Sequence, residues 1–429
     1  MKSRFVRTRT SIVLAIVVAA SFGLASCTAL AGPEVEDQQI FTPLPSGITR
    51  QLDAALADAL VLSGSSGALA GVWVPQAGEW VASPGTTTIN GGVPLTPDMR
   101  FRIGTNTTAM TCTVLLRLVD EGRVKLDDLV SRYLTRSAEV DGITLGQLCG
   151  QTSGLADYYP GLAPQFLTNP TRQWPPMEIL ASGLAGRRVS GPGGAWSQSS
   201  TGIVLLGMAL QSATHQSWPS LYRQYIFDPL GLRDTSFPAG NEFEIPGPHP
   251  HGYAVEVDAT GRRYCERLRD ETELSNSMGW VASGVVSTLA DMRTWARAFA
   301  EGSLLSDRLA EAQWQTVPQG ASAPPWQRYG LGGLQLGPLR GHAGAIPGFL
   351  SASLVDPESG LTVVVMLNNS SAGTGFVQSL AERLASIAST APATGAVPEP
   401  TLRLPWSEEQ AAVAMRSGAA CQVPASAAG

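Results

Sequence analysis

Charged side chains are scarce in this sequence of 429 residues. Only 15% of the residues are charged, and 29 Lys and Arg stand against 35 Asp and Glu, a formal charge of −6. This small acidic excess excludes a nucleic-acid-binding protein held by a basic surface. With 44% hydrophobic residues, the chain is not a disordered polyelectrolyte either. Its length predicts two lobes or one large composite domain.

Histidine and cysteine are also rare, with four and five residues. The sequence contains no CxxC pair and no HExxH helix, so neither a zinc site nor a thioredoxin-like redox site is expected. His249 and His251 stand close together, but Pro and Gly flank them and no third ligand is in view. We interpret them as part of a surface loop, and we expect no metal, no cofactor and a monomer.

The first thirty residues have the pattern of an export signal. Basic residues precede an apolar run at 12–24 that is too short to span a bilayer comfortably. Residues 24–27 read Leu-Ala-Ser-Cys, which resembles a bacterial lipobox, so 1–26 would be the signal peptide and Cys27 the lipidated residue. The open alternative is an ordinary secretory signal cleaved near Ala31. Lipidation would anchor a secreted protein to the outer face of the bacterial cell membrane.

Composition and periodicity divide the rest of the chain. Residues 27–44 are predicted to be a short acidic tether, and the Ala- and Pro-rich residues 391–429 a weakly structured tail. Between them, residues 45–390 form the folded domain. Strand patterns at both of its ends enclose a mostly helical stretch, about 126–289. This order predicts one sheet built from distant segments, an inserted helical lobe, and a cleft where the two meet.

Several short motifs, in this order, resemble the serine β-lactamase-related and penicillin-binding family, especially class C β-lactamases and D-alanyl-D-alanine carboxypeptidases. The resemblance covers about Leu52 to Leu384. It includes Phe-Arg-Ile-Gly at 101–104, Thr-Ser-Gly-Leu at 152–155, Ile-Phe-Asp-Pro-Leu-Gly-Leu at 226–232 and Gly-His-Ala-Gly at 341–344. It implies an α/β (α+β) fold in which an antiparallel sheet, flanked by helices and built from both chain ends, carries the inserted helical lobe.

The resemblance also implies where the catalytic groups would lie. The family uses a Ser-x-x-Lys, a Tyr-x-Asn or Ser-x-Asn, and a Lys/His-x-Gly. The matching positions here hold Thr105, Thr108, Gln198, Ser200 and, intact, His342-Ala343-Gly344. The backbone N–H groups of Thr105 and Ala345 are expected to form the oxyanion hole, and Gly344 to border the substrate.

Two of the three catalytic elements are therefore substituted. A hydroxyl nucleophile is weak without a base, and neither Thr108 nor Gln198 accepts a proton at neutral pH. His342 leaves two hypotheses open: it is the base for Thr105, or it only donates a hydrogen bond, since no carboxylate is seen to orient it.

These substitutions lead to two functional hypotheses. The first is a catalytically degenerate lipoprotein that binds a peptidoglycan peptide, a small molecule or a partner protein. The alternative is a weak hydrolase of carboxypeptidase, β-lactamase or esterase type, which uses Thr105, His342 and the oxyanion donors.

Four cysteines besides Cys27 would meet an oxidising exterior, where disulfides are allowed. These are Cys112, Cys149, Cys265 and Cys421, and they permit three pairings. Cys112 and Cys149 belong to neighbouring elements of the family fold, so the resemblance favours that bridge. Buried free thiols are the alternative.

Overall fold

An eight-stranded antiparallel sheet organises the chain in the computed structural model, which describes residues 42–135, 140–258, 262–320, 323–392 and 402–421. The predicted signal peptide 1–26, Cys27 and nearly all of the tether 27–44 lie outside these residues. In spatial order the strands are β2 (Gly78–Ala82), β1 (Ala68–Val74), β12 (Thr362–Leu367), β11 (Phe349–Val355), β10 (Leu339–Ile346), β9 (Leu334–Leu336), β8 (Gln327–Tyr329) and β7 (Val317–Pro318). Because β1 pairs with β12, the sheet joins both ends of the domain, as predicted.

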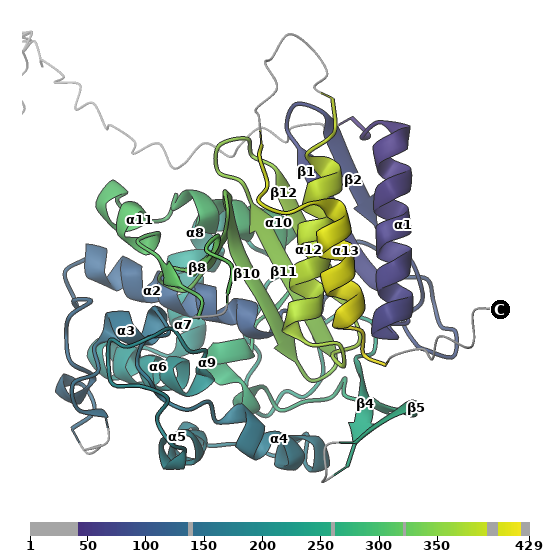
Figure 1. The fold of residues 1–429 in the computed structure, drawn as a ribbon. Helices are drawn as coiled ribbons and strands as arrows, with labels where there is room; N and C mark the ends of the chain where they lie inside the picture. The colour runs from purple at the N-terminus through teal and green to yellow at the C-terminus, as the bar shows by residue number, and fades with distance from the viewer. Residues whose placement is uncertain (1–41, 136–139, 259–261, 321–322, 393–401, 422–429) are drawn as a thin grey trace, which may run out of the picture. The chain divides into compact units, whose positions relative to one another are not determined.

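Helices cover both faces of this sheet (Figure 1). One face carries α1 (Ser46–Ser63), α12 (Thr374–Ala388) and α13 (Glu408–Ser417), and the other carries α10 (Leu289–Glu301). Along β12, Val363 and Val365 belong to the hydrophobic core under α1 and α12, while Val364 belongs to the core on the face that carries α10. Successive strand side chains point to opposite faces, so β12 is buried on both sides.

The stretch between the two groups of strands forms the helical lobe. Its helices are α2 (Thr107–Asp120), α3 (Leu145–Cys149), α4 (Tyr159–Thr168), α5 (Pro176–Ala185), α6 (Ser200–Thr214), α7 (Trp218–Tyr222), α8 (Asp228–Leu230) and α9 (Trp280–Ser283), with α11 (Asp307–Gln313) after α10. Two short pairs of strands accompany them, β3 (Phe101–Arg102) with β6 (Val286–Ser287) and β4 (Tyr253–Val257) with β5 (Arg263–Asp270). The expected α/β fold is confirmed, with one hairpin inside the mostly helical stretch.

The described part of the C-terminal tail differs from the prediction. Residues 402–421 are not weakly structured, because they contain α13, which packs along α12. Ala411 and Met415 are buried in this contact, and Ser407 caps the helix together with Gln410. The alanine-rich composition that suggested a loose tail is equally typical of a short helix, since alanine has the highest helix propensity.

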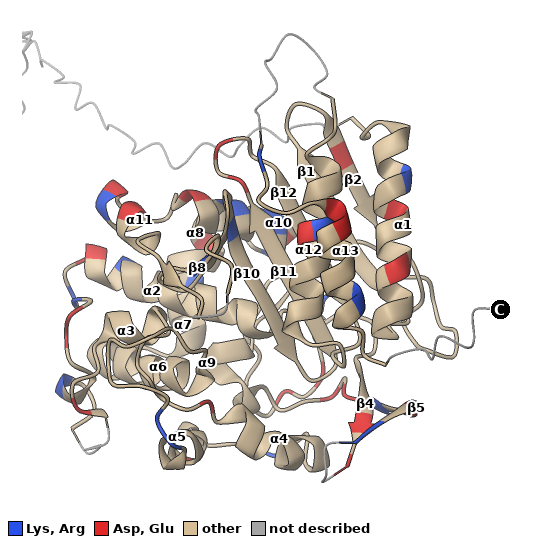
Figure 2. Ribbon diagram, viewed as in Figure 1, with Lys and Arg blue, Asp and Glu red and all other residues tan. Residues whose placement is uncertain are grey.

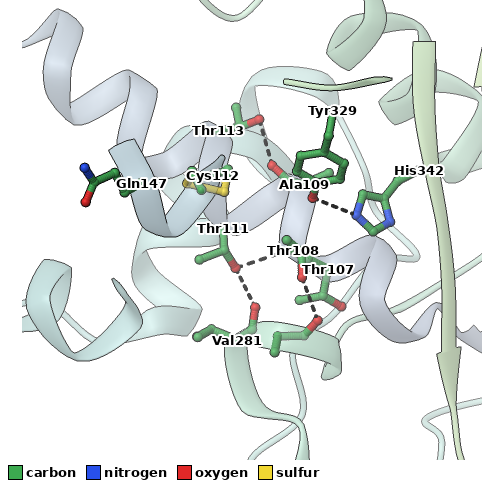
Figure 3. Close-up of a disulfide and its surroundings, with 12 residues drawn as sticks. Thr107, Thr108, Ala109, Thr111, Cys112, Thr113, Gln147, Val281, Tyr329 and His342 are labelled. Carbon is green, nitrogen blue, oxygen red and sulfur yellow. Dashed lines mark hydrogen bonds between the residues drawn. A yellow bond between two sulfur atoms is a disulfide. The ribbon is translucent and has the colours of Figure 1, made fainter. Parts of the chain in front are cut away.

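Two disulfides connect the four cysteines of the domain. Cys112 in α2 bonds Cys149 in α3, which confirms the favoured pairing (Figure 3). Cys265 in β5 bonds Cys421, just beyond α13. The alternative of free thiols is therefore wrong for all four residues. Among the described residues, no helix combines the length and the apolar character that a membrane span requires.

Candidate active site

The turn that precedes α2 is held directly against strand β10. It comprises Gly104 to Asn106, and Thr105 lies at its centre. A Cβ atom on Gly344 would lie 2.7 Å from the backbone nitrogen of Thr105, and one on Gly104 would lie 2.5 Å from the carbonyl carbon of Ala345. Real Cβ atoms do not approach backbone so closely. Glycine at both positions therefore lets the two backbones meet at the predicted nucleophile position.

A buried asparagine fixes this turn to the sheet. Asn106 is fully buried, and its Nδ2 donates to the hydroxyl of Ser351 in β11 at 2.7 Å. Ser351 Oγ in turn donates to the carbonyl of Ile103 at 2.6 Å. These bonds satisfy polar groups that would otherwise be buried without partners. The turn is thus a rigid part of the scaffold, although the sequence analysis did not single out Asn106 or Ser351.

A small cavity of about 40 Å³ lies beside this turn. Its lining residues are Thr105, Thr108, Gln151, Trp196, Gln198, Ser200, Gln319, Tyr329, Leu334, His342, Ala343, Thr374 and Gln378. The structure thus brings the five side chains predicted from the motifs into one site. Gly344 and Ala345 contribute through their backbone, which lies against the turn.

The hydroxyl groups of the cavity face oxygen atoms. Thr105 Oγ1 donates to the carbonyl of Ala343 at 3.4 Å, and Thr108 Oγ1 donates to the carbonyl of Ala282 at 3.2 Å. Ser200 Oγ lies 3.4 Å from Oδ2 of Asp157, a carboxyl whose pKa is raised mainly by burial. Within the described chain, Thr105 has no hydrogen bond to His342.

His342 is buried beside Tyr329, with 7% of its surface exposed. Its Nε2 lies 3.3 Å from the Tyr329 hydroxyl, as the dashed line in Figure 3 shows. Burial lowers the pKa of His342 to about 4, so the ring is neutral at physiological pH. The Nδ1 atom is also buried, and no described residue forms a hydrogen bond with it.

Tyr329 is a residue of this site that sequence reasoning missed. Burial raises its pKa far above the ordinary value, so the phenol keeps its proton, while Gln151 is hydrogen-bonded to it. The Trp196 ring packs against it, with ring centroids 5.7 Å apart. Of these three residues, only Gln151 directly precedes a stretch that resembles the family, Thr-Ser-Gly-Leu at 152–155.

The site is electrically neutral. No Lys, Arg, Asp or Glu of the described residues lines the cavity, and the helices α3, α6 and α9 near it are uncharged throughout (Figure 2). In the described parts of the chain, no group of three or more His, Cys, Asp or Glu side chains is placed to hold a metal ion.

Comparisons with known proteins agree with this architecture. The family model described as Beta-lactamase matches residues 53–387. The chain is 28% identical over 300 residues to the D-alanyl-D-alanine-carboxypeptidase/endopeptidase AmpH of Escherichia coli K12, an alignment covering 64% of this chain and 72% of AmpH. It is 25% identical to the putative penicillin-binding protein PbpX of Bacillus subtilis, covering 64% of this chain and 63% of PbpX.

Solved structures show the same similarity. A D-stereospecific amidohydrolase from Streptomyces sp. superposes with a TM-score of 0.66 at 29% identity, covering 76% of this chain and 95% of the other. The D-amino acid amidase of Ochrobactrum anthropi SV3 superposes with a TM-score of 0.64 at 26% identity, covering 76% of this chain and 92% of the amidase. By its fold, the order of its motifs and the extent of the family match, this chain belongs to the β-lactamase family of serine hydrolases and penicillin-binding proteins.

Proposed function

We propose that this chain is a catalytically degenerate member of its family, which binds a ligand in the cavity instead of hydrolysing it. The supporting observation is that, among the described residues that line the cavity, no side chain forms a hydrogen bond with Thr105 Oγ1, which donates to the Ala343 carbonyl. A base contributes about two to four orders of magnitude to such a reaction. Lys125 is the one lysine among the described residues; it is exposed, lies beyond the end of α2 and does not line the cavity.

The hydrogen bonds around His342 also argue against its use as a base. Gln151 Oε1 accepts the backbone N–H of Ser199 at 2.7 Å, which leaves the amide nitrogen of Gln151 to donate to the Tyr329 oxygen. The Tyr329 hydroxyl and His342 Nε2 are in turn hydrogen-bonded to each other. His342 Nε2 is therefore engaged by Tyr329, while the hydroxyl of Thr105 donates to the Ala343 carbonyl instead of to His342.

Covalent labelling tests this proposal. We expect the purified full-length chain to show no saturable labelling by a fluorescent penicillin and no saturable turnover of a chromogenic ester, because the hydroxyl of Thr105 lacks a base. A Thr105→Ala variant is the control for background reaction and is expected to match the wild type. Labelling of the wild type that disappears in Thr105→Ala would overturn the degenerate assignment.

One observation favours the alternative of a weak hydrolase of carboxypeptidase, β-lactamase or esterase type. β9 pairs with β10 only up to Gly341, so the rest of that edge of β10 is left free to face the turn. The Ala343 carbonyl points to this edge, because Thr105 donates to it. The backbone groups of successive strand residues point alternately to the two edges of the strand, so the N–H of Ala345, two residues further on, points to the same edge. The oxyanion donors expected at Thr105 and Ala345 are thus compatible with residual catalysis.

We also propose that Cys27 anchors the protein to the outer face of the bacterial cell membrane as a lipoprotein. The lipobox-like residues 24–27 after a short apolar run support this. Cells fed radiolabelled palmitate are expected to incorporate the label into the wild-type chain and not into Cys27→Ala. Equal labelling of both chains would contradict lipidation at this residue.

A further inference from the structure

The two disulfides differ in their access to solvent. Cys112 and Cys149 are both 0% exposed. Cys265 is exposed and Cys421 is half-buried, where the chain beyond α13 is joined to β5. Cleavage of a disulfide by exchange requires a thiolate to reach one of its sulfur atoms. Of these two bonds, only Cys265–Cys421 is therefore open to a thiol from solution.

A bulge in β5 carries Cys265. Two consecutive residues of β4 pair with Leu268 and Tyr264 of β5, so residues 265–267 have no pairing partner on β4. A bulge of this kind re-aims the side chains it carries, relative to a regular strand. The exposure of Cys265 thus follows from the irregular pairing of the hairpin.

A positive charge lies near the other cysteine of this bond. Arg263 Nη1 donates to the carbonyl of Ala420 at 3.1 Å, one residue before Cys421. When a disulfide is cleaved by exchange, one of its sulfur atoms leaves as a thiolate, and a nearby cation stabilises that thiolate. Attack on the exposed Cys265 therefore makes Cys421 the leaving group, on the side where Arg263 lies.

The bond fixes the C-terminal end of residues 402–421, which lie beyond the residues that the family model matches. α13 lies along α12 (Figure 1) and has ten residues, and a helix of that length is marginal without tertiary contacts. Before the helix, Trp406 Nε1 donates to the carbonyl of Glu382 at 3.2 Å. After it, the N–H of Ala420 donates to the carbonyl of Leu62 at 3.0 Å, next to the disulfide. The disulfide is thus the covalent attachment at the end of α13 that lies away from Trp406.

We propose that Cys265–Cys421 is a site of thiol–disulfide exchange with a dithiol protein, and that its reduction releases α13 from α12 while Cys112–Cys149 stays intact. A thiolate of the dithiol protein attacks Cys265 Sγ and forms a mixed disulfide, and Cys421 leaves as a thiolate that takes up a proton. The second thiol of the dithiol protein then attacks its own sulfur in the mixed disulfide, and Cys265 leaves and is protonated in turn. Two electrons pass to this chain, which gains two thiols, while the dithiol protein is oxidised to a disulfide. The inference is independent of the function proposed for the cavity, because none of these cysteines lines it.

Alkylation of the native protein tests the exchange. The purified full-length chain is incubated with an excess of reduced thioredoxin, whose CxxC pair is a dithiol, and then with iodoacetamide. Peptide mass mapping is expected to show thioredoxin-dependent alkylation of Cys265 and Cys421 that is at least about tenfold greater than that of Cys112 and Cys149, because the buried bond is out of reach. Equal alkylation of all four cysteines, or none at Cys265 and Cys421, would overturn the proposal.

Amide hydrogen exchange tests the release of α13. Exchange in this helix is expected to be at least about tenfold faster in the reduced chain than in the oxidised chain, because a short helix opens locally once its end is freed. Exchange in β12, in the middle of the sheet, is the internal control and is expected to stay unchanged. The double variant Cys265→Ser/Cys421→Ser is expected to show the fast exchange of α13 without thioredoxin and no further change with it. Equal protection of α13 in the oxidised and reduced wild type would overturn the release, and this comparison needs no variant to fold.

Discussion

A chain carrying Thr105→Ser, Thr108→Lys and Gln198→Tyr is expected to be acylated by penicillin about 10²–10⁴ times faster than the wild type, the range that a positioned base contributes. The three changes restore the family's nucleophile and its two proton carriers at the positions that match its motifs. The rest of the framework is present, because the turn that holds Thr105 is fixed by Asn106 and lies against β10. The rate of covalent labelling by a fluorescent penicillin measures the gain.

The positions of the restored groups line the cavity. Thr108 lines the cavity and is 4% exposed, so a longer side chain at this position extends into the cavity. The carbonyl of Ala282, which now accepts the Thr108 hydroxyl, is available to a lysine ammonium. Gln198 is exposed at the cavity and tolerates a larger ring. Serine in place of Thr105 removes a methyl group from the approach of a carbonyl carbon.

The matched control replaces each proton carrier by an apolar side chain of similar size. A chain with Thr105→Ser, Thr108→Met and Gln198→Phe has nearly the same volume in the cavity and no added titratable group. It is expected to react no faster than the wild type. If both triple variants label at the same slow rate, the missing base is not what limits acylation, and the degenerate assignment needs a different physical cause.

Local patterns predicted the parts of the fold that depend on burial along a single element. The strands at both ends of the domain and the mostly helical stretch between them follow from apolar periodicity. The order of short motifs then predicted that Thr105, Thr108, Gln198, Ser200 and His342 share one site, and the structure places them in one cavity.

The remaining site residues depend on tertiary placement. Tyr329 and Gln319 lie on opposite ends of a short hairpin at the sheet edge, and neither follows a pattern that marks a site. His342 is hydrogen-bonded to Tyr329, a residue 13 positions away that approaches through β8 and β9. No periodic pattern in the sequence predicts such a contact between two side chains. Alanine-rich composition likewise cannot separate a loose tail from α13, because docking on α12 decides between them.

Glu382→Gln is expected to stabilise the protein by about 3 kcal/mol at pH 8 and by little at pH 4. Glu382 is 5% exposed in α12, and burial raises its pKa to about 7 from 4.5. Between these two values the unfolded chain ionises this carboxyl while the folded protein keeps it protonated. The free energy of unfolding therefore falls as the pH rises from about 4.5 to about 7. Glutamine removes this loss and keeps an oxygen to accept the Gln378 amide.

Urea denaturation of wild type and variant at both pH values measures the effect. The difference between the free energies of unfolding of variant and wild type at each pH cancels the contributions of other titrating groups. These include Glu271, whose pKa burial also raises to about 7. Glu409→Gln is the matched control, since that side chain is 75% exposed on α13, and its effect is expected to stay within about 0.5 kcal/mol at either pH. A stabilisation by Glu382→Gln that is the same at pH 4 and pH 8 would show that the carboxyl is not held protonated by burial. The gain would then come from packing alone.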